Sequence, residues 1–442
     1  METVDLLISA RWVIPVEPDA VVLEHHAVAV RGRRIVDILP ASEAAQKYRA
    51  AEHHELPEHA LIPGLVNAHT HAAMSLMRGI ADDLPLMTWL QSHIWPTEAR
   101  WVGTEFVRDG TRLAIAEMLR GGTTCFNDMY FFPEVTARVA ATLGMRASIG
   151  MIVVDFPSAW ARDADEYIAR GIDEVFDAHK GEGLISACFA PHAPYTVSDA
   201  PLARIRNLAD ELDRPVHIHV HETRHEVDEH VAKHGMRPLA RLDSLGLLGP
   251  NLVAVHMTQL EDDEIALLAA RGASVVHCPQ SNLKLASGFC PVARLLDAGI
   301  NVALGTDGAA SNNDLDLWDE MRTAALLAKG VAGRADALPA HAALRMATLA
   351  GARALGLGEE IGSIEVGKAA DLVAVDLARI ETQPVYDPVS HLVYAAGREA
   401  VSHAWIAGQA KLVDGELTQL DGREIMTNAA AWAARIAAPE RA

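Results

Sequence analysis

Two histidines one residue apart, His69 and His71, follow the mostly apolar segment 62–68. On an extended strand, side chains two positions apart point to the same face, so both imidazoles would offer a nitrogen to one metal ion. The same pair would also fit a solvated loop. The other residues capable of chemistry therefore decide between these two interpretations.

Further histidines and carboxylates follow other apolar segments in the same way. They are His192, His219, Glu222, His256 and Asp307. Several imidazoles with one carboxylate suit Zn²⁺ with an open position, where a water is acidified toward neutral pH. Glu222, three residues after His219, would then be a free carboxylate placed to move protons.

Several of these residues also fit a purely structural role. His217, His219 and His221 alternate along one segment, and their spacing leaves open which of them binds metal. His192 lies between two prolines and would fit a braced loop, while Asp307 lies beside glycine and would fit a tight turn. His277 is a weaker ligand candidate. The smaller zinc deaminase fold is excluded, because its P-C-x-x-C motif is absent.

The elements that must position these residues alternate between apolar strands and helical segments such as 106–120 and 202–212. The predicted strands are 61–68, 123–128, 146–154, 184–190, 215–220, 252–256, 273–277 and 301–305. Eight such repeats predict an α/β fold of the (β/α)8 TIM-like barrel type, and the candidate residues fall at the carboxyl ends, where barrel enzymes build active sites. A doubly wound sheet is the alternative, but no glycine-rich phosphate loop follows an early strand.

Both ends of the chain differ from this middle. Short apolar runs separated by turn signals, such as Arg31-Gly32 and Asp414-Gly415, predict strands near each terminus. We therefore expect one small β-sandwich domain formed by residues 1–57 and 369–442, with the barrel occupying residues 58–368.

Composition limits the class of protein and its partners. The chain has 442 residues, 50% of them hydrophobic, and a formal net charge of -21, which argues against nucleic acid or an anionic membrane as a partner. The N-terminus lacks the features of a secretory signal, and no apolar run is long enough to span a bilayer. Four dispersed cysteines, Cys125, Cys188, Cys278 and Cys290, indicate reduced, buried thiols of a cytoplasmic protein.

Four segments together resemble a known family. They are Pro-Gly-Leu-Val-Asn-Ala-His-Thr-His (63–71), His219-x-x-Glu222, Ser-Asn-Leu-Lys-Leu-Ala-Ser-Gly (281–288) and Gly-Thr-Asp-Gly-Ala-Ala-Ser-Asn-Asn (305–313). The chain resembles the amidohydrolase superfamily over nearly its whole length, including segment 362–372. Within the superfamily it is most similar to the 5'-methylthioadenosine/S-adenosylhomocysteine deaminases, close to the guanine deaminase and triazine chlorohydrolase branches.

The resemblance implies a role for each candidate residue. The metal ligands would be His69, His71, His219 and Asp307, the catalytic residues Glu222, His256 and Asp307, and the substrate-binding residues Glu98, His192, Glu222 and Asp307. One Zn²⁺ per subunit is expected, because no strand-end lysine matches the carbamylated bridge of the two-metal relatives.

The implied reaction is zinc-dependent hydrolytic deamination of the adenine ring of 5'-methylthioadenosine and S-adenosylhomocysteine to the inosine analogue and ammonia. The partner is a small nucleoside substrate, with no nucleic acid or membrane partner. Leu84, Leu86, Met87, Trp89 and Trp95 would cover a thioether tail or simply pack their loop. Arg146, Arg162 and Arg170 have no clear counterpart among the substrate arginines of some members. The alternatives are guanine deamination, s-triazine amino- or chlorohydrolysis, and a non-catalytic barrel. Relatives often self-associate, so a homo-oligomer is an expectation.

Overall fold

The computed structural model describes residues 1–438. The larger part of this chain is built on an eight-stranded parallel sheet, in which the strands are neighbours in the order of the sequence. The strands are β5 (Leu65–Thr70), β6 (Thr123–Met129), β7 (Arg146–Val153), β8 (Ile185–Pro191), β9 (Val216–Val220), β10 (Leu252–His256), β11 (Ser274–His277) and β12 (Val302–Leu304). The first and last strands lie side by side, since the backbone N–H of Asp307 donates to the carbonyl of His69 at 3.0 Å. The predicted (β/α)8 barrel is confirmed.

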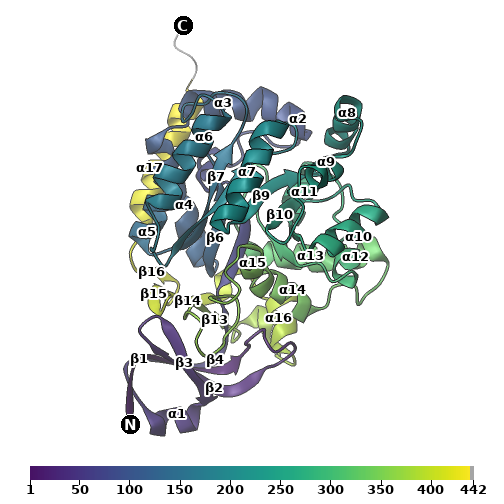
Figure 1. The fold of residues 1–442 in the computed structure, drawn as a ribbon. Helices are drawn as coiled ribbons and strands as arrows, with labels where there is room; N and C mark the ends of the chain where they lie inside the picture. Colours follow the sequence, from purple (N-terminus) through teal and green to yellow (C-terminus); the bar gives the residue numbers. More distant parts are fainter. Residues whose placement is uncertain (439–442) are drawn as a thin grey trace.

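Nearly every residue of these strands is buried, which is typical of parallel strands covered on both faces. Helices surround the barrel (Figure 1). They are α4 (Thr104–Arg120), α5 (Pro133–Leu143), α6 (Ala164–Gly171), α7 (Asp199–Leu212), α8 (Arg224–His234), α9 (Pro238–Ser244), α10 (Asp262–Arg271), α12 (Val292–Asp297), α13 (Leu317–Ala332), α14 (Ala340–Met346) and α15 (Leu349–Ala354).

Short helical segments lie at the carboxyl end of the barrel. They are η1 (Ala72–Met77), α2 (Leu86–Trp89), η2 (Leu90–Ile94), α3 (Trp95–Trp101) and α11 (Pro279–Lys284). The first four belong to the long connection between β5 and α4, and α11 follows β11. This connection therefore covers the end of the barrel at which the candidate residues gather.

A second sheet is built from both ends of the chain and lies below the barrel in Figure 1. Its order is β16-β15-β14-β13-β4-β1-β2-β3, with β1 (Glu2–Val13), β2 (Leu23–Arg31), β3 (Arg34–Pro40), β4 (Tyr48–Pro63), β13 (Leu372–Asp376), β14 (Val401–Ile406), β15 (Gln409–Val413) and β16 (Glu416–Leu417). Its joining pair is β4 with β13, where Ile62 lies opposite Val373. The predicted β domain formed by both termini is thus confirmed, while the boundaries at 57 and 369 stay a prediction, and residues 439–442 lie outside the described part.

The first predicted strand, 61–68, was expected to be continuous, and this was wrong. Residues up to Pro63 belong to β4 of the terminal sheet, and β5 of the barrel begins at Leu65. The chain changes sheets at Gly64, where a Cβ atom would lie only 1.9 Å from Oγ1 of Thr124. Glycine permits this close approach, and no larger residue would fit without displacing β6.

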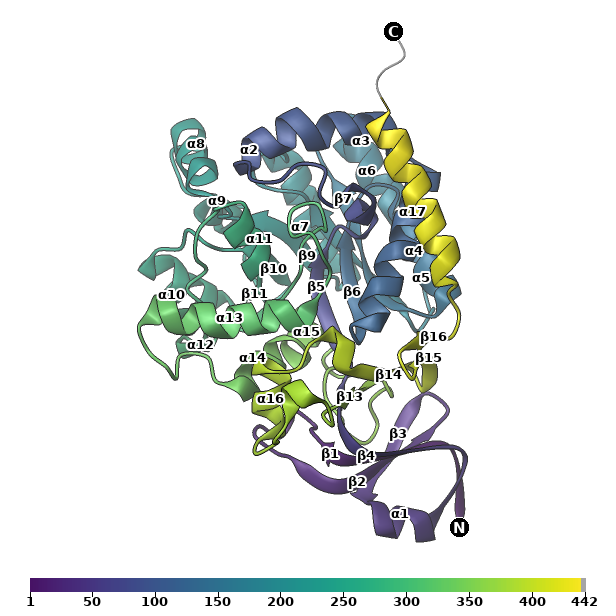
Figure 2. The ribbon, with the colours of Figure 1, turned by 180° about the vertical axis from the view of Figure 1, so that it is seen from behind.

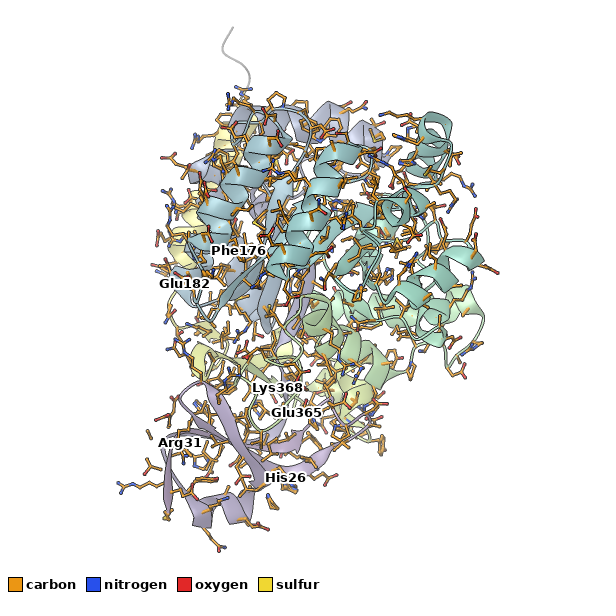
Figure 3. All side chains as sticks on the ribbon, in the orientation of Figure 1. His26, Arg31, Phe176, Glu182, Glu365 and Lys368 are labelled. Atoms are coloured by element: carbon orange, nitrogen blue, oxygen red, sulfur yellow. The ribbon has the colours of Figure 1, made fainter. Side chains whose placement is uncertain are left out.

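A buried ion pair joins the barrel to the terminal sheet. Nε and Nη2 of Arg146 on β7 donate to the two carboxylate oxygens of Asp371 at 2.7 and 3.0 Å. Glu365 and Lys368 lie where the barrel meets the terminal sheet (Figure 3), and their charged groups are 3.2 Å apart. The segment that the resemblance singled out, 362–372, therefore forms part of this junction.

The chain ends in α17 (Gly422–Ala437), which lies along α4 and reaches α3 (Figure 2). Its Trp432 is buried, and the indole N–H donates to Asp109 of α4 at 3.0 Å. The last helix thus packs against the barrel rather than the terminal sheet. Among residues 1–438, no helix combines the length and apolar character needed to cross a bilayer.

Candidate metal centre and active site

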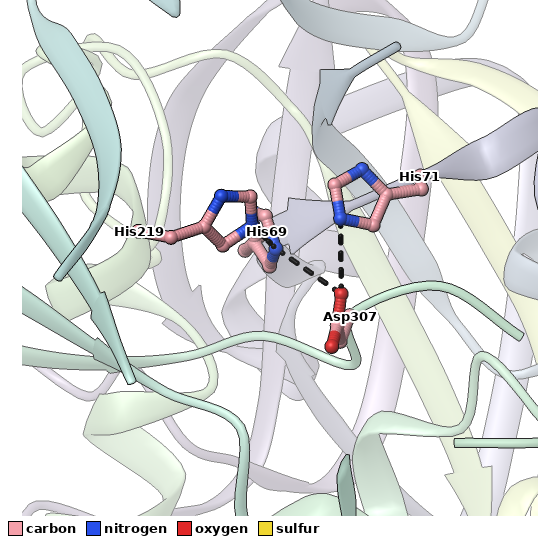
Figure 4. A group of neighbouring side chains, drawn as sticks. All are labelled: His69, His71, His219 and Asp307. Carbon is pink, nitrogen blue, oxygen red and sulfur yellow. Dashed lines mark hydrogen bonds and ion pairs between the residues drawn. The ribbon is translucent and has the colours of Figure 1, made fainter. Parts of the chain in front are cut away.

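Four of the predicted residues meet at the carboxyl end of the barrel. His69 is the last but one residue of β5, and His71 follows that strand. His219 lies on β9, and Asp307 follows β12. One ligand atom from each lies within 4.8 Å of the others (Figure 4). Nε2 of His69 and of His71 are 3.3 and 3.1 Å from Oδ1 of Asp307. Three imidazoles and a carboxylate beside a pocket form a donor set that fits Zn²⁺.

The Nδ1 atoms of the three imidazoles point away from this group. Nδ1 of His71 donates to the carbonyl of Met129 at 2.5 Å, and Nδ1 of His219 donates to the carbonyl of His192 at 2.7 Å. A carbonyl can only accept, so both rings carry a proton on Nδ1, which leaves Nε2 as the nitrogen available to a metal ion. This is the tautomer that a metal ligand needs.

The third imidazole is held by another histidine. Nδ1 of His69 lies 2.8 Å from Nε2 of His217, whose ring is fully buried inside the barrel. Sequence reasoning placed His217 only as one of three alternating histidines. The two-residue spacing puts His217 and His219 on the same face of β9, whereas His221, at the same spacing, follows the end of the strand with a φ of +55°.

Asp307 is held in an unusual backbone conformation by its neighbours. Its φ is +60°, and its Oδ2 accepts hydrogen bonds from Ser281 and Ser311 at 2.7 and 2.8 Å. Burial opposes its ionisation, but the close contacts of its carboxylate with the His69 and His71 rings outweigh burial and hold its pKa well below the usual range. Asp307 is therefore an anion, as a metal ligand must be.

Glu222 follows β9 and is buried beside this group. Burial, with a further contribution from the charge of Asp307, raises the pKa of Glu222 to about 8. Its backbone is fixed because Glu226 accepts its N–H at 2.7 Å and Thr258 donates to its carbonyl at 2.7 Å. A carboxyl group with a pKa close to neutrality can both accept and donate a proton during a reaction.

His256, the last residue of β10, faces Glu222, with 3.9 Å between Nε2 and the nearer carboxylate oxygen. Its φ is +76°, and its Nδ1 donates to Oδ1 of Asn282 in α11 at 2.8 Å. Nε2 is therefore free to accept a hydrogen bond within the site. Asn282 belongs to a segment noted in the sequence, but its contact with His256 was not foreseen.

Glu98 reaches the same pocket from α3. Its Oε1 accepts a hydrogen bond from the hydroxyl of Tyr130 at 2.7 Å, and burial raises its pKa to about 7. His192 follows β8, and its Nδ1 forms a hydrogen bond with Oγ1 of Thr196 at 3.0 Å. Sequence reasoning did not find Tyr130, because its partner lies 32 positions away on another element.

These residues line one pocket with a volume of about 440 Å³. The lining combines imidazoles and carboxylates with mainly apolar and aromatic side chains, including Trp89, Ile94, Phe131, Val154 and Phe156. Leu86, Trp89 and Trp95 of the predicted tail-covering loop belong to this lining. None of the described residues that line the pocket is a lysine or arginine.

Two other histidine features take no part in the group of four. His221-Glu222-Thr223-Arg224-His225 has the letters of the H-E-x-x-H motif, which needs one helix to bring both histidines together. Here His221 precedes α8 and accepts from the N–H of Leu239, while His225 is exposed and pairs with Glu229. His277 is buried but lies outside the group.

Residues 60–411 match the Amidohydrolase family. The chain belongs to the amidohydrolase family. It is 52% identical over 434 residues to a protein of Saccharophagus degradans named 5-methylthioadenosine/S-adenosylhomocysteine deaminase, covering 98% of this chain and 97% of that one. It is 47% identical over 377 residues to a 5'-deoxyadenosine deaminase of Methanothermobacter thermautotrophicus, covering 85% of this amidohydrolase and 87% of the relative.

A crystal structure of another protein has the same fold as this amidohydrolase. An adenosine deaminase from Xanthomonas campestris with bound zinc superposes with a TM-score of 0.97 at 59% identity. The match covers 98% of this chain and 99% of that chain. Both the barrel and the sheet formed by the two termini are therefore shared with that protein.

Proposed function

We propose that this amidohydrolase is a zinc-dependent deaminase. Its reaction converts the adenine ring of 5'-methylthioadenosine, S-adenosylhomocysteine and related 5'-substituted adenosines into the hypoxanthine ring of the inosine analogue and releases ammonia. The observation that carries the proposal is the group His69, His71, His219 and Asp307 beside Glu222 in one pocket. The names of the relatives support the substrate class.

His69, His71, His219 and Asp307 would hold the zinc. When bound, Zn²⁺ supplies a Lewis acid that lowers the pKa of a coordinated water toward neutrality. The buried carboxylate of Asp307 offsets part of the charge of the ion. The Nδ1 contacts of the three imidazoles support this assignment, because they leave each Nε2 available to bind an ion.

Glu222 is the proposed proton carrier. It takes one proton from the attacking water and gives it to N1 of the adenine ring while the water oxygen bonds to C6. The pKa of about 8 supports this role, because the group then exchanges protons readily near neutral pH. Asp307 receives the second proton of the water and passes it to the amino group as the C6–N bond breaks and ammonia leaves.

The remaining residues are proposed to orient the reactants. Nε2 of His256 accepts a hydrogen bond from the attacking water, because its Nδ1 proton is engaged by Asn282. Glu98 accepts hydrogen bonds from the ribose hydroxyls, with Tyr130 holding its carboxyl group in place. His192 contacts the purine and, through its carbonyl, holds His219.

Substitution of a single ligand tests the proposal. We expect purified His69→Ala to lose stoichiometric zinc and to lose deamination of 5'-methylthioadenosine, measured by metal analysis and by the change in purine absorbance. His225→Ala is the matched control, because His225 is exposed and lies outside the group. Full zinc content and full activity in His69→Ala would refute the proposed metal site.

We also propose that the enzyme works in the cytoplasm and self-associates. All four cysteines are free and buried, as predicted, which is usual in a reducing compartment. Size-exclusion chromatography with light scattering measures the oligomeric state, and a purely monomeric protein at working concentration would contradict self-association.

A further inference from the structure

The acidic and basic side chains of the pocket lining are carboxyl groups and imidazoles. Its lining contains the carboxyl groups of Glu98, Glu222 and Asp307, and no described lining residue is a lysine or arginine. A bound zinc ion would offset the carboxylates at the purine end. The other lining side chains are mainly apolar or aromatic.

Several basic residues near the pocket in sequence have partners elsewhere. Arg100, which follows the lining residue Ala99, has its guanidinium 4.9 Å from the ring centre of Trp101. Arg170 donates to Glu174 at 2.8 Å, and Arg162 donates to Glu166 at 2.8 Å with most of its side chain exposed. Lys284, which precedes the lining residue Leu285, contacts Asp82 at 2.6 Å. Arg146 lies at the junction with the terminal sheet, bound to Asp371.

The position of the purine decides where the rest of a nucleoside lies. With C6 beside Glu222 and the ribose hydroxyls at Glu98, a 5' substituent must occupy the remaining part of the pocket. That part is lined by side chains such as Trp89, Ile94 and Phe156. A methylthio group is apolar and polarizable and suits such walls.

The homocysteine tail of S-adenosylhomocysteine ends in an ammonium group and a carboxylate, both of which are charged. Its ammonium group could contact a carboxylate of the pocket, but its carboxylate would lose water and gain no positive partner. Burial of an unpaired charge is strongly unfavourable. Arginine commonly recognises a carboxylate through two parallel hydrogen bonds. No described residue that lines this pocket is an arginine.

We infer that this pocket selects adenosines whose 5' substituent is small and uncharged, and that it discriminates against the amino-acid tail of S-adenosylhomocysteine. The inference rests on the proposed function. It concerns the relative rate for the two kinds of tail and leaves the chemistry at C6 unchanged.

The test compares kcat/KM of the zinc-loaded enzyme for three substrates: 5'-methylthioadenosine, 5'-butylthioadenosine and S-adenosylhomocysteine. Butylthioadenosine separates charge from size, because its tail has a length similar to homocysteine but no charge. We expect its kcat/KM to lie within about tenfold of methylthioadenosine and that of S-adenosylhomocysteine to be lower by at least roughly a hundredfold.

A variant adds the missing cation. Phe156 lines the pocket and is 44% exposed, so Phe156→Arg places a guanidinium at the rim without emptying the core. We expect the ratio of kcat/KM for S-adenosylhomocysteine over butylthioadenosine to rise by about tenfold or more. Phe156→Gln, polar but uncharged, is the control and should leave the ratio nearly unchanged.

Two results would overturn the inference while leaving the deaminase intact. One is a kcat/KM for S-adenosylhomocysteine within about tenfold of butylthioadenosine in the wild type, and the other is an equal loss for both long tails, which would show that size decides. An unchanged ratio in Phe156→Arg would also contradict it. Failure of all three substrates would instead refute the proposed function.

Discussion

Nδ1 of His69 and Nε2 of His217 lie 2.8 Å apart, and their rings are within 23° of parallel. Nε2 of His69 faces Asp307 and His219, and with that nitrogen bound to a metal ion the ring proton is on Nδ1, where Nε2 of His217 accepts it. The other ring nitrogen of His217 is buried and has no hydrogen-bond partner in the described structure. An unsatisfied buried donor costs roughly 1–3 kcal/mol, so the action of His217 on His69 explains its presence better than a gain in stability does.

His217→Leu should therefore weaken zinc binding without weakening the fold. The leucine side chain cannot accept the proton of His69, and loss of such a partner typically costs roughly 10- to 100-fold in metal affinity. Competition with a chelator measures the affinity, and thermal unfolding of the metal-free protein measures stability.

His217→Gln is the conservative variant, since an amide oxygen can accept the same hydrogen bond, and we expect it to keep most of the affinity. His277→Leu is the matched control, because His277 is also buried with an unpartnered Nδ1 but lies outside the group of four. Equal zinc affinity in His217→Leu and wild type would refute the role of His217.

Glu222→Gln should bind zinc normally and lose most of its turnover. Glutamine keeps the shape of the side chain but cannot carry the proton from water to N1, and general acid–base catalysis is worth roughly 10²- to 10⁴-fold. Steady-state kinetics measures kcat of the variant, and metal analysis of the same sample measures its zinc content. Glu229→Gln on the exposed face of α8 serves as the control. A variant that loses zinc and activity together would contradict a role in proton transfer alone.

Glu98→Ala should distinguish a nucleoside from a free base. We expect kcat/KM for 5'-methylthioadenosine to fall by about a hundredfold, since hydrogen bonds to charged groups contribute roughly 1.5–3 kcal/mol, and the much slower reaction of adenine to change little. Tyr130→Phe removes the hydrogen bond to Glu98 and should give a smaller loss in the same direction. Equal losses for nucleoside and base would exclude the ribose contact.

Asp316 provides a pH test away from the pocket. It caps α13 by accepting the N–H of Trp318 at 2.9 Å, and burial raises its pKa from 3.8 to about 7. Because the folded pKa lies above the unfolded value, its contribution to stability is complete below pH 3.8 and is lost as the pH rises through about 7. Asparagine accepts the same hydrogen bond without becoming charged.

The Asp316→Asn variant should accordingly match the wild type at acidic pH and exceed it in free energy of unfolding near about pH 8, by roughly 4 kcal/mol at most. Urea unfolding at several pH values measures this difference. A difference that does not vary with pH would show that Asp316 is already ionised in the folded protein at low pH.

Strands and strand-end residues were predictable because the apolar runs are short and uniform. The predicted ranges for β6, β9 and β10 agree with the structure within one residue. The division of segment 61–68 was not predictable, since it depends on Thr124 of β6 lying against Gly64. An apolar run alone does not reveal a change of sheet.

The group of four was proposed from a family resemblance, and its surroundings needed coordinates. Partners such as Tyr130 for Glu98, Asn282 for His256 and His217 for His69 come from separate elements. Spacing along one strand predicts which side chains share a face, but not which residue of another strand they meet. The absence of a cation from the pocket is likewise a property of the assembled barrel.

The most direct test of the central proposal is an ultraviolet assay of the zinc-loaded enzyme with 5'-methylthioadenosine, S-adenosylhomocysteine, adenosine, adenine and guanine, following the aminopurine spectrum and the release of ammonia. The proposed function predicts rapid conversion of 5'-methylthioadenosine with one ammonia released per nucleoside consumed. No turnover of any adenosine by protein that carries one zinc per chain would contradict it.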